Sequence, residues 1–222
     1  MNSFLNFLAN NAYSQLDVSE HQVDLQGWMC DQFEHVFRAS LPDGNPEPFI
    51  IEVGTWKGLS TTTMARVCKT VGYERARILA IDTWLGAPKF WCSGLYEFER
   101  GGSFNFMNGY PTVFYTFTKN VKVLGHDDMI VPFPISSAQA PDVLRHYGGL
   151  ADIIYIDASH EYDAVVADLR AYWPLLKEGG VMFGDDYVDC WPGVMSAVDE
   201  FAQSNGLALK IDGIVWSVRK GA

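Results

Sequence analysis

Hydrophobic positions change their spacing along the chain, and the change predicts where helices and strands lie. In residues 1–41 the apolar side chains recur about every three or four positions, which is typical of helices. The stretch from Leu41 to Pro48 contains three prolines and a glycine, so the helical region should end there. Beyond it, short β-like runs alternate with amphipathic helices, which indicates a parallel sheet covered on both faces.

The expected elements follow from this alternation. Strands are predicted at residues 49–53, 77–81, 130–135, 152–156 and 181–184, and helices at 60–71, 141–147 and 162–177. The last helix carries one apolar stripe, and Gly179-Gly180 is expected to end it. Residues 207–219 read as two strands around Asp212-Gly213, a turn that makes the final strand antiparallel to its neighbour.

One connection is unusually long and aromatic. Residues 83–129 separate two predicted strands, whereas such connections usually have about two to six residues. A long insertion on an α/β scaffold is often an active-site lid. The alternative is that its aromatic side chains form extra core or a dimer face, and the sequence leaves both interpretations open.

Composition indicates one compact domain. The chain has 222 residues, of which 48% are hydrophobic, and this length fits one domain over 1–222 with an N-terminal extension (1–41) and the 83–129 insertion. The net charge of −11 and the lack of a dense Lys/Arg cluster argue against a nucleic-acid partner.

Targeting signals are not apparent in the sequence. The apolar runs are too short to span a bilayer, and no Lys or Arg precedes Arg38, so neither a membrane segment nor a secretory signal is expected. The four cysteines form no CxxC pair and should be free thiols in a reducing compartment. A cytoplasmic location is the expectation.

A glycine turn follows the first strand. Residues 52–60 read EVGTWKGLS, with Gly54 and Gly58 four positions apart where a strand leads into a helix. Such a turn lets backbone amides approach a ligand and lets the helix start pack closely. The pattern is neither GxGxxG, because Trp56 replaces a glycine, nor a P-loop. The next strand ends at Asp82, whose carboxylate can take both ribose hydroxyls of an adenosyl ligand.

A second group of polar residues ends two later strands. Asp157 ends one strand, and Asp185-Asp186 end the next, so the three carboxylates should converge at the carboxyl edge of the sheet. A hard divalent cation would relieve their repulsion, although helix capping also explains many such aspartates. His160, at a helix start, is a candidate general base for an acceptor hydroxyl, and Asp157 is the alternative.

With these motifs, the sequence resembles the class I S-adenosylmethionine-dependent methyltransferases. The resemblance rests on residues 51–60, 80–84, 154–162 and 175–187, and it is strongest to the branch of metal-dependent macrocin- and novobiocin-type sugar O-methyltransferases and cephalosporin hydroxylase-like proteins. It implies a Rossmann-like, doubly wound, mostly parallel seven-stranded sheet with an antiparallel C-terminal strand. It also implies S-adenosylmethionine and Mg²⁺, or another divalent cation, as cofactors.

The resemblance further implies residue roles. In that branch an Asp followed by an Asp-Asp pair binds the metal, which corresponds here to Asp157, Asp185 and Asp186. The expected donor-binding residues cover the methionine end, the ribose and the adenine, namely Glu52, Gly54, Thr55, Gly58, Asp82, Thr83, Ser136 and Ser137.

The expected function is methyl transfer to a hydroxyl of a small molecule, such as a sugar, diol or phenol, with metal assistance. One rival is a nicotinamide-dependent oxidoreductase on a similar sheet, which the missing GxGxxG disfavours. A second rival is a non-catalytic adenosyl-binding or interaction protein. Whether the chain forms a homo-oligomer is left open.

Overall fold

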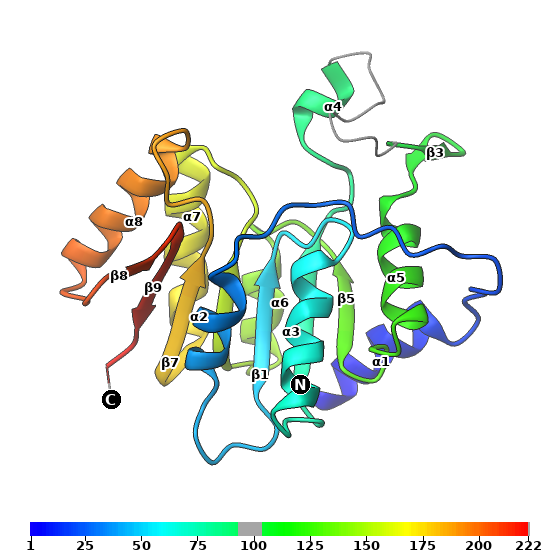
Figure 1. The fold of residues 1–222 in the computed structure, drawn as a ribbon, viewed down its shortest axis with the longest axis horizontal. Coiled ribbons are helices and arrows are strands. Elements are labelled where there is room, and N and C mark those ends of the chain that lie inside the picture. Colours follow the sequence, from blue (N-terminus) through cyan, green and yellow to red (C-terminus); the bar gives the residue numbers. More distant parts are fainter. Residues whose placement is uncertain (93–103, 222) are drawn as a thin grey trace.

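A single seven-stranded sheet organises the chain. The computed structural model describes residues 1–92 and 104–221, and within them the main sheet has the strand order β5-β2-β1-β6-β7-β9-β8 (Figure 1). The strands, in that order, are Ile130–Pro134, Arg77–Asp82, Phe49–Val53, Ala151–Ile156, Leu176–Gly184, Val215–Arg219 and Lys210–Asp212.

Most of the sheet is parallel. Strand β1 pairs in parallel with β2 on one side and β6 on the other, while β9 is antiparallel to both β7 and β8. The predicted doubly wound sheet with an antiparallel C-terminal strand is therefore confirmed. From β1 the strand order continues through β2 to β5 on one side of the sheet, and from β6 it continues through β7 on the other side. The switch point therefore lies between β1 and β6, and ligands of such sheets bind at this point.

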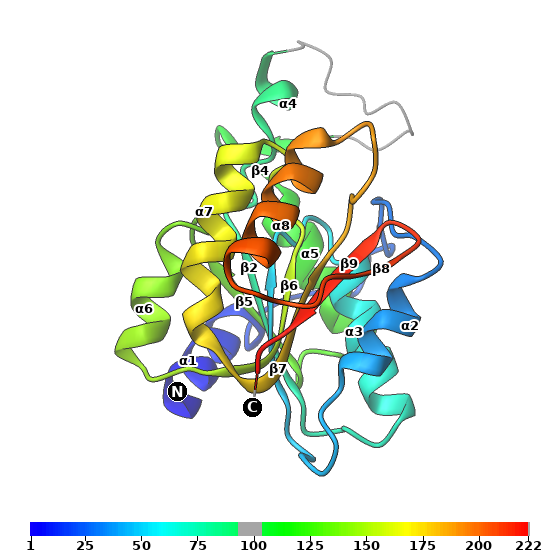
Figure 2. The same ribbon diagram turned by 90° about the vertical axis from the view of Figure 1, so that its left-hand side faces the viewer.

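Helices cover both faces of this sheet (Figures 1 and 2). One face packs against α6 (Ala140–His146), α7 (Tyr162–Tyr172) and α8 (Pro192–Ser204), and the other against α2 (Phe33–Ser40), α3 (Leu59–Thr70) and α5 (Val113–Val123). Helix α1 (Asn2–Tyr13) packs on β5 at the edge of the sheet.

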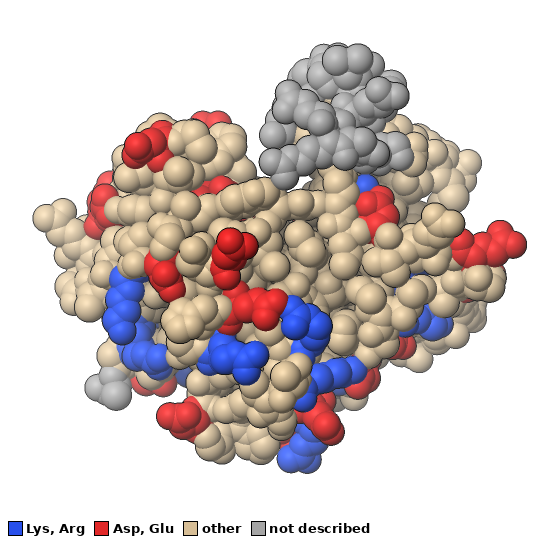
Figure 3. Space-filling view, in the orientation of Figure 1, with Lys and Arg blue, Asp and Glu red and all other residues tan. Residues whose placement is uncertain are grey.

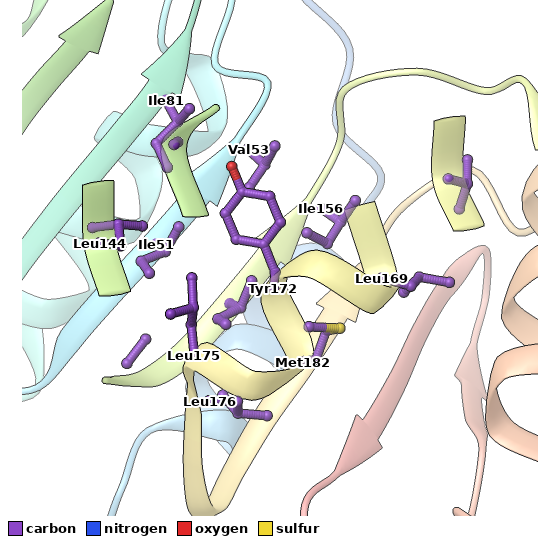
Figure 4. Close-up of a cluster of buried hydrophobic side chains, with 14 of the residues drawn as sticks. Ile51, Val53, Ile81, Leu144, Ile156, Leu169, Tyr172, Leu175, Leu176 and Met182 are labelled. Atoms are coloured by element: carbon purple, nitrogen blue, oxygen red, sulfur yellow. The ribbon is translucent and has the colours of Figure 1, made fainter. Parts of the chain in front are cut away.

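Alternation along the strands explains the two layers. Ile51 and Val53 of β1 face the α6–α8 layer, whereas Ile50 faces the α2–α3–α5 layer. Both sets are buried, so the strands read as nearly continuous apolar runs. Figure 4 shows Ile51 and Val53 in the first layer, where strand side chains gather around Tyr172 of α7.

The N-terminal region differs from the prediction. Residues 14–32, expected to be helical, form an irregular segment between α1 and α2 that runs along the carboxyl ends of the central strands (Figure 1). The side chain of Asn120 in α5 accepts the backbone N–H of Asp24 at 3.0 Å and donates to its carbonyl at 2.7 Å. A tertiary contact thus pairs the backbone N–H and C=O of Asp24, which a helix would otherwise have paired.

The predicted helix 162–177 was too long. Helix α7 ends at Tyr172, a 3₁₀ turn covers Trp173–Leu175, and β7 already begins at Leu176. Pro174 explains the end, because it has no N–H to continue the α-helical bonding. Gly179-Gly180 consequently lies inside β7, where the register against β6 shifts, and does not end a helix.

Helices α5 and α8 were not expected from the sequence. The apolar positions Val194, Ala197, Val198 and Phe201 bury one side of α8. Helix α5 lies within the aromatic connection and buries Phe117, so this part belongs to the core.

The rest of the aromatic connection is less regular. It includes α4 (Pro88–Cys92) and the short strands β3 (Phe106–Met107) and β4 (Tyr110–Pro111). Residues 93–103 lie outside the described residues, so the lid and interface interpretations stay predictions. Among the described helices, none has the length and apolar content needed to cross a membrane.

Candidate active site

The predicted site residues lie at neighbouring strand ends. The amide of Gly54 donates to the carbonyl of Ile81 at 2.9 Å, and that of Asp157 donates to the carbonyl of Val53 at 2.8 Å. These bonds continue the sheet for one residue beyond β1 and β6. Residues 136–137 follow β5 on the other side of β2. The glycine turn, the acid at the end of β2 and the strand-end aspartates therefore share one edge of the sheet.

Close packing requires both glycines of the turn. Gly54 has a φ of 86°, and a Cβ there would lie 2.1 Å from the carbonyl oxygen of Asp157. Gly58 has a φ of 91°, and its Cβ would lie 3.0 Å from the ring of Phe117. Gly54 was expected mainly to admit a ligand. The structure shows in addition that it lets the turn pack directly on the end of β6.

Asp82 organises the glycine turn. Its Oδ2 accepts the backbone N–H groups of Thr55 at 3.0 Å and Trp56 at 2.9 Å, and its Oδ1 accepts that of Trp84 at 2.7 Å. Trp56 and Trp84 both have positive φ, a conformation that costs non-glycine residues about 1–3 kcal/mol each. Asp82 therefore stabilises a strained loop, and its carboxylate retains lone pairs for ribose hydroxyls.

Glu52 lies beneath the turn and is fully buried. The hydroxyl of Ser60 donates to its Oε1, and burial, aided by the charge of Asp82, raises the pKa of Glu52 to about 8. Its Oε2 has no hydrogen-bond partner among the described residues, and the same is true of the buried hydroxyl of Thr55. Two buried polar atoms at one turn are thus available to a ligand.

The other residues predicted to bind S-adenosylmethionine lie in different environments. Thr83 is exposed, and its hydroxyl accepts the N–H of Leu85 at 3.2 Å. The hydroxyl of Ser136 donates to Gln139 at 3.0 Å, and the carbonyl of Ser137 accepts the hydroxyl of Tyr172 at 2.9 Å. Ser136 and Ser137 are thus held just after β5, and their adenine-binding role stays a prediction.

Two of the three predicted carboxylates, Asp157 and Asp186, lie together, and His160 joins them in place of Asp185. One ligand atom each of Asp157, His160 and Asp186 lies within 4.8 Å of the others, and Nε2 of His160 is 2.8 Å from Oδ2 of Asp186. Asp185 lines a small pocket together with these three residues, and its Oδ1 accepts the N–H of Asp186 at 2.9 Å. His160, predicted as a base, is therefore also placed as a possible metal ligand.

The electrostatics of this group favour a cation. Burial, followed by the charges of Asp186 and Asp185, raises the pKa of Asp157 well above its ordinary value. Burial likewise raises the pKa of Asp185 to about 6, and the charge of Asp186 contributes. Carboxylates in such surroundings release their protons more readily when a divalent ion is bound between them.

Sequence reasoning missed three neighbours of the acidic group. The hydroxyl of Tyr155 donates to Oδ2 of Asp157 at 2.9 Å, the nearby thiol of Cys30 partly offsets the rise that burial causes in the pKa of Asp185, and the ring centroids of Trp191 and His160 lie 4.2 Å apart. The period of two along β6 could have placed Tyr155 on the same side as Asp157. The other two come from distant segments that no local pattern connects to the site.

Taken together, the open, mostly parallel sheet, the glycine turn after β1 and the acids that end β2, β6 and β7 define a Rossmann-like class I methyltransferase fold. The chain belongs to the methyltransferase domain family, whose model matches residues 51–187.

Individual relatives are distant. Uncharacterized protein R132 of Acanthamoeba polyphaga mimivirus is 26% identical over 152 residues, which are 68% of this chain and 57% of that protein's length. The solved structure of the O-methyltransferase NovP has a TM-score of 0.60 at 15% identity and covers 100% of this chain and 99% of its own. MycE methyltransferase from the mycinamycin biosynthetic pathway, in complex with Mg, SAH and mycinamycin VI, has a TM-score of 0.51 at 15% identity, over 98% and 54% of the two chains.

Proposed function

We propose that the protein is an S-adenosylmethionine-dependent O-methyltransferase that acts on a small hydroxylated molecule with the help of a divalent metal ion. The observation that carries this proposal is the convergence of Asp157, His160 and Asp186 at a strand end directly beside the glycine turn. The turn suits an adenosyl donor, and the adjoining acidic group suits the activation of an acceptor hydroxyl.

The residues present fit a divalent cation. Asp157, Asp185 and Asp186 offer the oxygen ligands that Mg²⁺ prefers, and His160 offers a nitrogen that Mn²⁺ also accepts. The magnesium ion named with MycE supports this choice. When bound, such an ion lowers the pKa of a coordinated hydroxyl and fixes its orientation.

Different residues of this chain would then bind the donor and accept the proton during methyl transfer. The turn at Gly54, with Glu52 and Asp82, would bind and orient the donor. The acceptor oxygen attacks the methyl carbon, the carbon–sulfur bond breaks, and the hydroxyl proton passes to His160 or Asp157 as general base. Both candidate bases remain in this proposal.

The surface charge favours an acceptor without anionic groups. On the face shown in Figure 3, lysine and arginine side chains gather mostly around the lower half, where the amino ends of the strands lie. The carboxyl edge that carries the site shows few of them on this face, and the whole chain has a net charge of −11. A neutral or cationic sugar, diol or phenol meets less repulsion there than a phosphorylated acceptor would.

The proposal is tested by following radiolabelled methyl groups from S-adenosylmethionine onto a panel of catechols, vicinal diols and sugars. Product should form with Mg²⁺ and disappear with EDTA. Donor binding without any turnover would favour the non-catalytic rival. Binding of a nicotinamide cofactor in place of S-adenosylhomocysteine, measured by calorimetry, would favour the oxidoreductase.

A further inference from the structure

Tyr155 occupies an unusual position beneath the acidic group. Its side chain is 1% exposed, its ring stacks on that of Phe183 with centroids 4.7 Å apart, and it meets the ring of Phe33 edge-on at 5.1 Å. These aromatic contacts from β7 and α2 hold the ring without any help from its hydroxyl.

The hydroxyl of Tyr155 points to the site. It donates to Oδ2 of Asp157 at 2.9 Å, because side chains two positions apart lie on the same side of β6. A phenol keeps its proton at neutral pH, so the single O–H of Tyr155 is committed as a donor to Asp157.

We infer that Tyr155 is a positioning residue that fixes the orientation of the Asp157 carboxylate. Its hydrogen bond engages Oδ2 and holds the carboxylate in one orientation, so its remaining lone pairs would be offered to a metal ion in that orientation. Without it, the Asp157 side chain would rotate about χ2, whose energy profile is broad for a carboxylate. Outer partners of this kind orient metal ligands in many proteins. The inference rests on the proposed metal-dependent function.

Tyr155→Phe tests this inference because it removes only one oxygen and keeps the aromatic packing. Tyr73→Phe is the matched control, since it removes a hydroxyl that donates to the carbonyl of Pro42 at 2.9 Å, away from the site. Affinity for Mn²⁺ is measured by electron paramagnetic resonance on the full chain, and donor affinity by calorimetry with S-adenosylhomocysteine. The Tyr155→Phe variant should bind Mn²⁺ about tenfold more weakly, with donor affinity unchanged and Tyr73→Phe like the wild type.

A double variant separates positioning from a purely structural effect. If Tyr155 acts through Asp157, adding Tyr155→Phe to Asp157→Asn should weaken Mn²⁺ binding by less than about twofold, because the ligand it orients is already altered. An unchanged Mn²⁺ affinity in Tyr155→Phe, with the wild type binding normally, would overturn the positioning role alone. A wild-type protein that binds no Mn²⁺ would overturn the metal proposal and this inference with it.

Discussion

The Nζ atom of Lys57 lies 2.6 Å from Oδ2 of Asp24. This ion pair joins the glycine turn to the N-terminal segment 14–32, and the Lys57 side chain is only 3% exposed while that of Asp24 is 44% exposed. The amide of Asn120 reinforces the junction by donating to the carbonyls of both residues. The glycine turn and the N-terminal segment are thus one packed unit, although the residues of the pair are far apart in sequence.

Asp24→Asn should destabilise this unit, because it leaves the ammonium of Lys57 buried without its counter-charge. We expect the free energy of unfolding to fall by about 1.5–3 kcal/mol, the scale of a hydrogen bond to a charged group. Chemical denaturation measures the change. Asp17→Asn, in the same segment but exposed, is the control and should leave stability nearly unaltered. Equal stability of both variants would show that the pair contributes nothing.

Substitution of Asp82 should reveal both of its roles. Asp82→Asn loses the charge and one of the two acceptor oxygens, so it should weaken binding of S-adenosylhomocysteine by about 1.5–3 kcal/mol in calorimetry and lose part of the bonding to the loop. Asp82→Ala should weaken binding at least as much and also lower stability, because three backbone N–H groups lose their acceptor. Unchanged donor affinity in Asp82→Asn would refute the ribose assignment and leave Asp82 with its loop-holding role.

Stability should depend on pH through Asp168 of α7. This side chain is 5% exposed, and burial raises its pKa to about 6, partly offset by a hydrogen bond with Ser137. The folded state therefore binds the proton more tightly than the unfolded state, so the contribution of Asp168 falls as pH rises from about 4 to 6 and stays low above that. The loss amounts to about 3 kcal/mol by neutral pH.

Asp168→Asn should remove this dependence. Compared with the wild type, the variant should gain stability steadily between pH 4 and 6 and keep the gain above it, as urea denaturation at a series of pH values would show. Asp163→Asn, in the exposed first turn of the same helix, is the control and should follow the wild type. Parallel pH curves for Asp168→Asn and the wild type would contradict the prediction.

The sequence predicted the sheet well because local patterns encode it. Buried strands read as short apolar runs, and strand ends carry the glycine turn, Asp82 and Asp157, so topology alone brings these residues to one edge. The irregular course of residues 14–32 was not predictable in this way. Its backbone at Asp24 is held by the side chain of Asn120, which lies 96 positions away in the sequence, and no local spacing reveals such a contact.

The partners of individual side chains could not be predicted from the sequence either. Asp82 was predicted as a ribose ligand, and the structure shows that it also accepts three backbone amides of the chain, because the turn that it faces is folded back onto it. His160 lies beside Asp186, and its ring packs against Trp191 at the start of the unexpected helix α8. Such contacts depend on elements that meet only after folding.

Metal dependence gives the sharpest prediction for the acidic group. EDTA should abolish methyl transfer, and added Mg²⁺ should restore it, while the affinity for S-adenosylhomocysteine should change little because the proposed donor contacts lie at the glycine turn. Asp157→Asn, Asp185→Asn and Asp186→Asn should each mimic chelation, since an amide keeps the shape but not the coordinating charge. Initial rates with a hydroxylated acceptor and calorimetry of the donor provide the two measurements.

The pairwise combinations decide whether these aspartates act as one metal site. If they share one ion, the first substitution releases it and a second costs little more, so the double variants should be about as slow as the single ones. Independent contributions would multiply instead, as expected for aspartates that only cap helices or stabilise loops. Asp142→Asn, an exposed residue of α6 paired with Arg145, is the control for charge removal. Full activity after exhaustive chelation would leave His160 or Asp157 as a base that works without metal.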